Sequence, residues 1–125
     1  MDAPSIVLAE PNELLRKVLD DKLSMHGFNI LPVVNGIELE EILDEKTVDL
    51  IIAEEFLPYK NGLEIIELAN LKNIPVIIIS DADLEEKIIE AFELGASDFI
   101  DKPFSPNEVL ARAKNILKTK SRVNV

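Results

Sequence analysis

The chain has 125 residues and a mass of 14.0 kDa, and 47% of its residues are hydrophobic, so it has the size of one globular domain and is too short for two. It has no cysteine, which excludes thiol catalysis, redox sensing and thiolate metal sites. Its 13 basic and 24 acidic residues give a net charge of -11. A negative charge of this size repels DNA, RNA and anionic membrane surfaces, so we expect none of these as partners.

The sequence carries no sign of membrane insertion or export. No apolar run approaches the roughly 20 residues of a spanning helix, and the first residues lack the basic flank and apolar stretch of a signal peptide. We therefore expect a cytoplasmic protein. Residues 1–119 are expected to form the domain, and residues 120–125, with Lys120 and Arg122, a basic C-terminal tail or the start of a linker.

Five short apolar runs, each bounded by polar or turn-forming residues, predict β-strands. They lie at residues 6–9, 30–34, 50–53, 76–79 and 98–100. The second run contains Pro32, which cannot donate a hydrogen bond to a neighbouring strand. This strand is therefore expected at or near an edge of the sheet.

Each run is followed by a segment whose apolar residues recur at helical spacing. The first segment ends at Gly27, the second begins at Gly36, the third follows the pair Asn61 and Gly62, and the fourth ends at Gly95. The fifth begins with a capping box at residues 105–108, whose proline takes the first helical position. The residues of these apolar stripes are Leu15, Val18, Leu19, Leu23, Ile37, Ile42, Leu43, Leu63, Ile66, Leu68, Leu84, Ile88, Ala91, Phe92, Val109, Leu110, Ala113, Ile116 and Leu117, and we expect them to face inward.

Five strands that alternate with five helices over short connections predict an α/β fold, a parallel sheet with helices on both faces. In such a sheet the ligand site lies beyond the carboxyl ends of the strands. The residues expected at that edge are Glu10, Pro11, Asn12, Glu54, Glu55, Phe56, Ser80, Asp81, Asp101, Lys102 and Pro103. We expect two carboxylates, a hydroxyl and an ammonium group to converge there on one small crevice.

These residues, together with the segments 49–54, 57–62, 95–99 and 102–104, resemble the receiver domain of two-component response regulators. The resemblance covers nearly the whole chain, and the motifs fall in the family's order and spacing. It implies a (βα)5 flavodoxin-like, doubly wound parallel sheet of strand order 2-1-3-4-5. It also implies a role in phosphorelay signal transduction, in which an aspartate after the third strand accepts a phosphoryl group with the aid of Mg2+.

The sequence departs from the family's pattern where the chemistry takes place. Glu54 stands at the position of the phosphoacceptor aspartate. Of the acidic pair expected after the first strand, Glu10 matches the first member and Pro11 replaces the second; Glu10 could equally be an acid that favours the dipole of the following helix. The positions that contact the phosphoryl group or respond to it keep the family's residue types, and they are Ser80, Phe99 and Lys102.

These departures predict a pseudo-receiver, a signalling module that is not an enzyme and in which Glu54 is not phosphorylated. Pro11 offers no carboxylate to a metal, so we expect weak or absent Mg2+ binding and no cofactor. The extra methylene of Glu54 moves its carboxylate by about 1 Å, and a misplacement of that size can cost roughly a hundredfold in rate. We expect Glu54 to form an ion pair with Lys102 instead.

Two other functions remain open at this point. The first is a conventional receiver in which Glu54 or a neighbouring residue is still modified. The second is a flavodoxin-like protein that binds FMN, a nucleotide or another small ligand, or a small hydrolase. The four glycines argue against a phosphate-binding loop because they are spread along the chain and never cluster.

The resemblance further implies partners among signalling proteins, either a histidine kinase or an effector domain. It implies a possible homodimer through the face made by the fourth helix, the fifth strand and the fifth helix. Lys87 with Glu108, and Asp98 with Arg112, fall at positions resembling charge pairs that are matched across the two-fold axis of such dimers. The alternative is that they are scattered surface charges, worth about 0 to 1 kcal/mol each.

Overall fold

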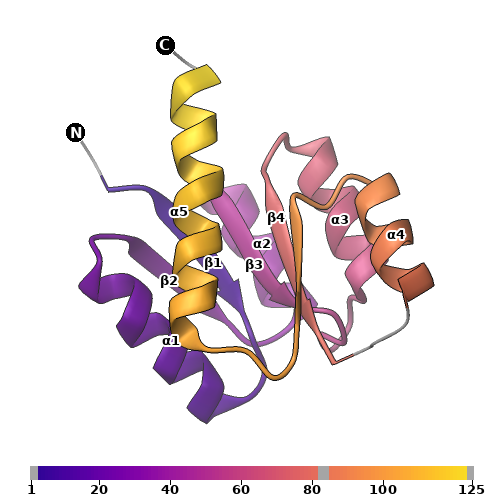
Figure 1. The fold of residues 1–125 in the computed structure, drawn as a ribbon, viewed down its shortest axis with the longest axis horizontal. Helices are drawn as coiled ribbons and strands as arrows, with labels where there is room; N and C mark the ends of the chain where they lie inside the picture. The colour runs from indigo at the N-terminus through magenta and orange to yellow at the C-terminus, as the bar shows by residue number, and fades with distance from the viewer. Residues whose placement is uncertain (1–2, 82–84, 124–125) are drawn as a thin grey trace.

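The computed structural model describes residues 3–81 and 85–123, with side chains described outside 85–87 and 119–123. Strands and helices alternate along these residues (Figure 1). The strands are β1 (Ser5–Ala9), β2 (Asn29–Val33), β3 (Leu50–Glu54), β4 (Val76–Ser80) and β5 (Asp98–Asp101). The helices are α1 (Glu13–Met25), α2 (Gly36–Glu45), α3 (Gly62–Leu71), α4 (Glu85–Glu93) and α5 (Pro106–Val123).

The strands form one parallel sheet in the order β2-β1-β3-β4-β5. This confirms the α/β fold that the sequence pattern predicted and the strand order 2-1-3-4-5 that the resemblance implied. β2 is an edge strand, as expected from Pro32, which lies in register with Leu8 of β1. β3 lies at the centre of the sheet and is buried along its whole length.

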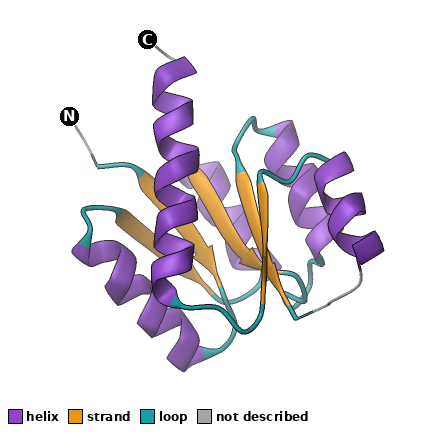
Figure 2. Ribbon diagram, viewed as in Figure 1, coloured by secondary structure: helices purple, strands orange, loops and turns teal. Residues whose placement is uncertain are grey.

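Helices cover both faces of the sheet (Figure 2). Alternate side chains of a strand point to opposite faces, and the strands accordingly divide their apolar residues between two cores. Val7 and Ile51 belong to the core that contains residues of α2, α3 and α4. Leu8 and Ile52 belong to the core that contains residues of α1 and α5. The two cores hold the ends of β1, β3, β4 and β5 in fixed positions relative to one another.

Asparagine side chains begin three of the helices immediately beyond strand or turn. Asn12, Asn35 and Asn61 each accept a hydrogen bond from a backbone N–H in the first turn of α1, α2 and α3. Asn61 also forms a complete capping box with Glu64. These caps satisfy backbone donors that would otherwise lack partners, so they fix where each helix leaves the loop that precedes it.

Some of the residues expected to face inward do not. Val18, Ile37, Leu63 and Phe92 are 40%, 50%, 40% and 46% exposed, so their expected burial was wrong. Each of them follows or precedes a buried residue in the sequence, and consecutive residues of a helix lie about 100° apart around its axis. The buried stripe of each helix is therefore narrower than the apolar pattern suggested. Leu84 lies outside the described residues.

The C-terminal helix α5 begins at Pro106, as the capping signal predicted, and continues to Val123. The division of the chain at residue 119 thus falls within a helix, and the role of residues 120–125 stays a prediction. Within residues 3–81 and 85–123, no helix combines the length and the apolar character needed to cross a membrane.

Candidate functional site

Four of the polar side chains expected at one edge of the sheet are brought together there by the strand ends. Glu10 follows β1, Glu54 ends β3, Ser80 ends β4 and Lys102 follows β5. Glu10, Glu54 and Ser80 are 3%, 8% and 0% exposed, and they are the buried polar or charged residues of the described chain. Burying polar groups costs free energy unless they are paired, so their gathering in one place marks this edge as the candidate site.

Glu54 and Lys102 form an ion pair at the centre of this edge. Glu54 Oε2 lies 2.7 Å from Lys102 Nζ, with the two side chains 9% and 28% exposed. Among the described residues, this buried oxygen has no hydrogen-bond partner beyond that ion pair. The structure therefore brings together the two residues that the sequence predicted to pair.

Burial and charge act on both members of this pair. Burial raises the pKa of Glu54 above its usual range, opposed by the contact with Lys102 and aided by the negative charges of Glu10 and Asp81. Burial lowers the pKa of Lys102, but the contact with Glu54 and the charges of Glu10 and Asp81 outweigh it, and the net pKa is raised. The charges of three carboxylates thus act on one ammonium group, and one of these carboxylates, that of Glu54, contacts it.

Ser80 interacts with Glu55, a residue that the sequence placed at this edge without predicting the contact. The Ser80 hydroxyl donates a hydrogen bond of 3.1 Å to Glu55 Oε1. A backbone hydrogen bond also joins Glu55 to β4: the Glu55 N–H donates to the carbonyl oxygen of Ile79 at 2.9 Å. Two consecutive carboxylates, Glu54 and Glu55, therefore engage the ammonium and the hydroxyl that the resemblance assigns to phosphate.

Glu10 faces the start of α1. Its Oε2 accepts a hydrogen bond of 3.0 Å from the backbone N–H of Asn12, and its carbonyl oxygen accepts one of 2.8 Å from Arg16 Nη1. Glu10 therefore contacts the start of α1 and is also buried at the same edge of the sheet as Glu54, so it combines the two alternatives that the sequence left open. Pro11, beside it, is exposed.

Two carboxylates at this edge are engaged by groups of the chain itself, which bears on the near-octahedral oxygen shell that Mg2+ requires. Of the carboxylates at this edge, Glu54 faces Lys102 and Glu10 faces a backbone N–H, while Pro11 has no carboxylate. In the part of the chain that the structure describes, no group of three or more His, Cys, Asp or Glu side chains is arranged to hold a metal ion.

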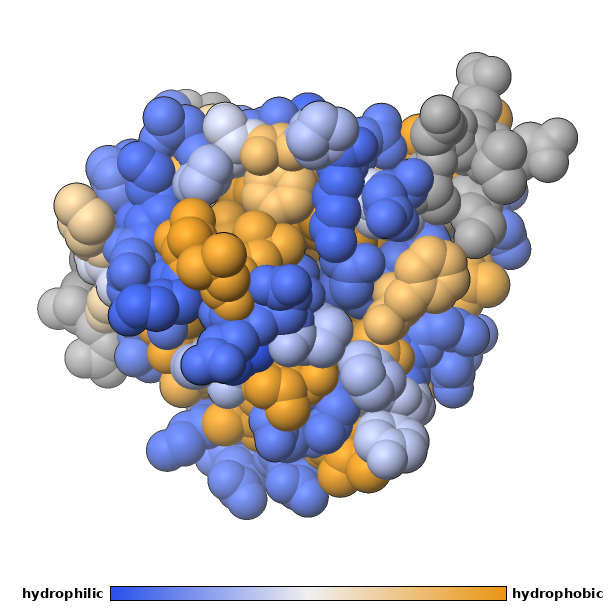
Figure 3. Space-filling view, turned by 90° about the horizontal axis from the view of Figure 1, so that it is seen from below, coloured by the Kyte–Doolittle hydropathy of each residue, from blue (hydrophilic) through white to orange (hydrophobic). Residues whose placement is uncertain are grey.

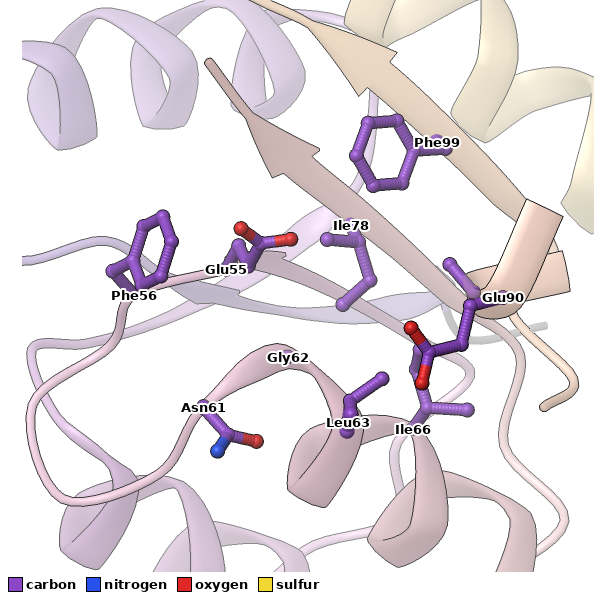
Figure 4. Close-up of a pocket in the computed structure, with 10 residues that line it drawn as sticks. Glu55, Phe56, Asn61, Gly62, Leu63, Ile66, Ile78, Glu90 and Phe99 are labelled. Carbon is purple, nitrogen blue, oxygen red and sulfur yellow. The ribbon is translucent and has the colours of Figure 1, made fainter. Parts of the chain in front are cut away.

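Phe99, at the aromatic switch position, points inward and is 8% exposed. Its ring lines a cavity together with Ile78 of β4 (Figure 4). Ala91 of α4 lines the same cavity. Glu55 lines the same cavity. The switch position and the acceptor of the Ser80 hydrogen bond therefore border one space.

The charged residues of the proposed interaction face pair within the chain. Arg112 Nη1 lies 2.9 Å from both carboxylate oxygens of Asp98, and Arg112 Nε lies 3.5 Å from Glu108 Oε1. The side chain of Lys87 lies outside the described residues. Asp98 and Arg112 thus lie on β5 and α5 as expected, in a contact that one copy of the chain satisfies alone.

Known proteins share this fold and this sequence pattern. The sequence profile described as "Response regulator receiver domain" matches residues 6–114. The chain belongs to this family. A receiver domain is a signalling module. We call the edge of the sheet that carries Glu54 and Lys102 the phosphoacceptor edge, after the role that the sequence resemblance assigns to these positions in the family.

Two curated response regulators are similar over almost the whole receiver. The aerobic respiration control protein ArcA of Escherichia coli (strain K12) is 34% identical over 118 residues, which cover 94% of this chain and 50% of the relative. The regulatory protein VirG of Agrobacterium tumefaciens (strain 15955) is 38% identical over 121 residues, which cover 94% and 45%. The chain thus spans about half the length of these relatives.

Solved receiver structures agree with the fold. The Francisella response regulator 1452 receiver domain has a TM-score of 0.87 and 26% identity, with 94% of this chain and 98% of the other covered. HP1043, an orphan response regulator of H. pylori, has a TM-score of 0.83 and 28% identity, with 91% and 96% covered.

Proposed function

We propose that this receiver is a signalling module that acts through protein–protein contacts without phosphorylation of Glu54. One observation carries the proposal: the two groups that would hold a phosphoryl group are both engaged by carboxylates of the chain. Lys102 pairs with Glu54 at 2.7 Å, and Ser80 donates to Glu55 at 3.1 Å. An incoming phosphoryl group must displace both contacts.

The chemistry of phosphoryl transfer makes this displacement costly. Such transfer depends almost wholly on the positions of the reacting atoms and on neutralisation of charge. The carboxylate of Glu54 stands one methylene further from the backbone than an aspartate would, and one of its oxygens already contacts the ammonium group. Both alignment and charge neutralisation are thereby weakened at the same residue.

The metal that the family uses is also expected to bind weakly or not at all. Mg2+ binds through near-octahedral oxygen ligands, typically one or two carboxylates with waters and phosphate oxygens. Glu10 uses one carboxylate oxygen for the N–H of Asn12, and Pro11 offers none. Next to Glu54, the chain itself supplies positive charge through Lys102.

The internal pairs are expected to hold the loops in one state. The carboxylate of Glu54 carries a single negative charge, against about -1.5 to -2 for a phosphoryl group, so it reproduces only part of the charge of a modified aspartate. Ser80 is held by Glu55, and Phe99 is buried. We infer that this arrangement persists whether or not a kinase is active.

The partners are then other signalling proteins, among them a histidine kinase or an effector domain. Relatives named as control and regulatory proteins are about twice the length of this chain, and an attached effector domain would be one way for it to act. Dimerisation through α4, β5 and α5 is a second way, in which Asp98 and Arg112 would exchange partners across a two-fold axis.

Incubation with acetyl phosphate and Mg2+, followed by measurement of the intact mass, tests this proposal. We expect the unmodified protein to show no stable species heavier by the mass of one phosphoryl group, about 80 Da. A clear phosphorylated species that disappears in the Glu54→Gln variant would show that Glu54 is a functional phosphoacceptor, and the proposal would be wrong.

A further inference from the structure

A cavity of about 150 Å³ opens between α3 and α4, next to the phosphoacceptor edge (Figure 4). Its walls are largely apolar and come from Leu63, Ile66, Ile78, Ala91 and Phe99. An apolar cavity of about 150 Å³ is large enough to hold a benzene-sized group. The space therefore fits one apolar side chain, such as leucine or phenylalanine.

Exposed apolar side chains extend this cavity onto the surface. Phe56 and Leu63 both line it, and they are 58% and 40% exposed. Seen from below the view of Figure 1, the surface carries hydrophobic patches set among hydrophilic side chains (Figure 3). Exposed apolar surface that is bordered by polar residues is typical of contact sites for other proteins.

The charges that border the cavity are negative. Glu55, which follows β3, and Glu90, on α4, line it from two different elements (Figure 4). Among the residues whose side chains the structure describes, which leaves out Lys87 of α4, no lysine or arginine lines the cavity. Glu90 is exposed and Glu55 is half-buried. The whole chain has a net charge of -11, so a positively charged partner is attracted to this surface from a distance.

We propose that this cavity is a docking site for a segment of a partner protein that carries an apolar anchor residue with lysine or arginine residues beside it. The anchor fills the space between α3 and α4, and the basic residues pair with Glu90 and Glu55. Complementary charges at the edge of such an interface favour encounter and specificity more than affinity, so the anchor supplies most of the binding. The inference rests on the proposed function, since it gives the interaction module one of its surfaces.

Glu55 connects this docking site with the phosphoacceptor edge. The oxygen that accepts the hydrogen bond from Ser80 belongs to the carboxylate that borders the cavity. A basic residue that pairs with Glu55 competes with the Ser80 hydroxyl for that carboxylate. Docking is therefore expected to change the surroundings of Ser80 as well as those of the cavity.

The probe is a synthetic peptide, GKKLKG with blocked ends, titrated into the 15N-labelled protein and followed by amide resonances. We expect saturable shifts that centre on Gly62, Leu63 and Ala91, with a smaller shift at Ser80. The peptide GKKGKG, which has the same charge and no anchor, should bind about tenfold more weakly. The peptide GEELEG, with the charges reversed, should not bind.

Matched protein variants separate the pocket from general attraction between opposite charges. Glu90→Lys should weaken binding of GKKLKG about fivefold, and Glu90→Gln should weaken it less. Glu41→Lys makes the same charge change at an exposed residue of α2 that does not line the cavity, and it should have less than about half that effect.

Three results would overturn the proposal: no shift at about 10 mM peptide, equal affinity for GKKLKG and GKKGKG, or equal effects of Glu90→Lys and Glu41→Lys. The phosphorylation test is independent of this titration. If GKKLKG binds as expected and Glu54 is nevertheless phosphorylated, the docking site stands and the phosphorylation-independent function fails. If no peptide binds and Glu54 stays unmodified, the phosphorylation-independent function stands and the docking site fails.

Discussion

Replacing Lys102 with methionine is expected to lower the free energy of unfolding by about 2 kcal/mol at neutral pH. The substitution removes the ammonium group that lies 2.7 Å from Glu54 Oε2 and leaves a carboxylate that is 9% exposed without a compensating charge. Breaking a buried ion pair from one side typically costs about 3 to 5 kcal/mol. The loss expected here, about 2 kcal/mol, lies below that range because the Lys102 side chain is 28% exposed and its charge is partly solvated.

The effect of this substitution should depend on pH in a defined direction. The pKa of Glu54 is raised in the folded protein, so Glu54 favours folding when it is protonated, and this contribution is lost as the pH rises through its folded pKa. Lys102 lowers the pKa of Glu54, so Lys102→Met raises it further. The loss of stability should therefore shrink as the pH falls below that raised pKa, which urea unfolding and a carboxyl 13C titration of Glu54 can measure.

Lys60→Met is the matched control for this experiment. Lys60 Nζ lies 2.7 Å from Glu40 Oε1, the same distance as in the site, but the Glu40 side chain is 54% exposed. The carboxylate left behind is solvated, so this variant should lose less than about 1 kcal/mol. Equal losses for the two variants would contradict the view that Glu54 is a buried charge that depends on Lys102.

The double substitution Glu54→Asp with Pro11→Asp is expected to create a site that accepts a phosphoryl group, whereas we expect the unchanged chain to accept none. The shorter side chain withdraws the carboxylate from Lys102, and position 11 gains a carboxylate that can bind Mg2+. After incubation with acetyl phosphate and Mg2+, the intact mass should rise by about 80 Da. Because both alignment and metal binding are restored, the change in rate should exceed about a hundredfold.

Two controls make this gain specific. Pro11→Asp alone should stay unmodified, because Glu54 keeps its position and its ion pair. Glu55→Asp with Pro11→Asp shortens the neighbouring carboxylate instead, and it should also stay unmodified. A folded Glu54→Asp, Pro11→Asp protein that takes up no phosphoryl group would show that these two positions do not decide whether the site is phosphorylated.

The fold could be predicted from the sequence because local signals agree with the tertiary structure. The apolar runs, the glycines and the proline of the capping box all mark the elements that the structure contains, and Pro32 places β2 at an edge. The burial of single residues was less certain. Ile37 follows Gly36, which is buried, and an apolar pattern alone does not say which of two neighbours faces the sheet.

The site was only partly visible in the sequence. Parallel strands bring their carboxyl ends to one edge of the sheet. The sequence could therefore place four residues there, each at or just after the end of a strand: Glu10, Glu54, Ser80 and Lys102. Glu55 was missed as a partner of Ser80, because the contact joins residues 25 apart and depends on the course of the backbone after β3. The consecutive acidic pair at this strand end was the one available signal.

We expect Glu54 and Glu55 to keep engaged the two groups, Lys102 and Ser80, to which the resemblance assigns contact with phosphate. Titration of the unmodified protein with beryllofluoride and Mg2+, which together mimic a phosphoryl group on a carboxylate, tests it directly through the amide resonances of Ser80, Phe99 and Lys102. We expect these resonances to stay unchanged, while the Glu54→Asp, Pro11→Asp protein gives a second, saturable set. A saturable second set in the unmodified protein would show that Ser80 and Lys102 can bind the mimic, which would contradict their engagement by Glu55 and Glu54.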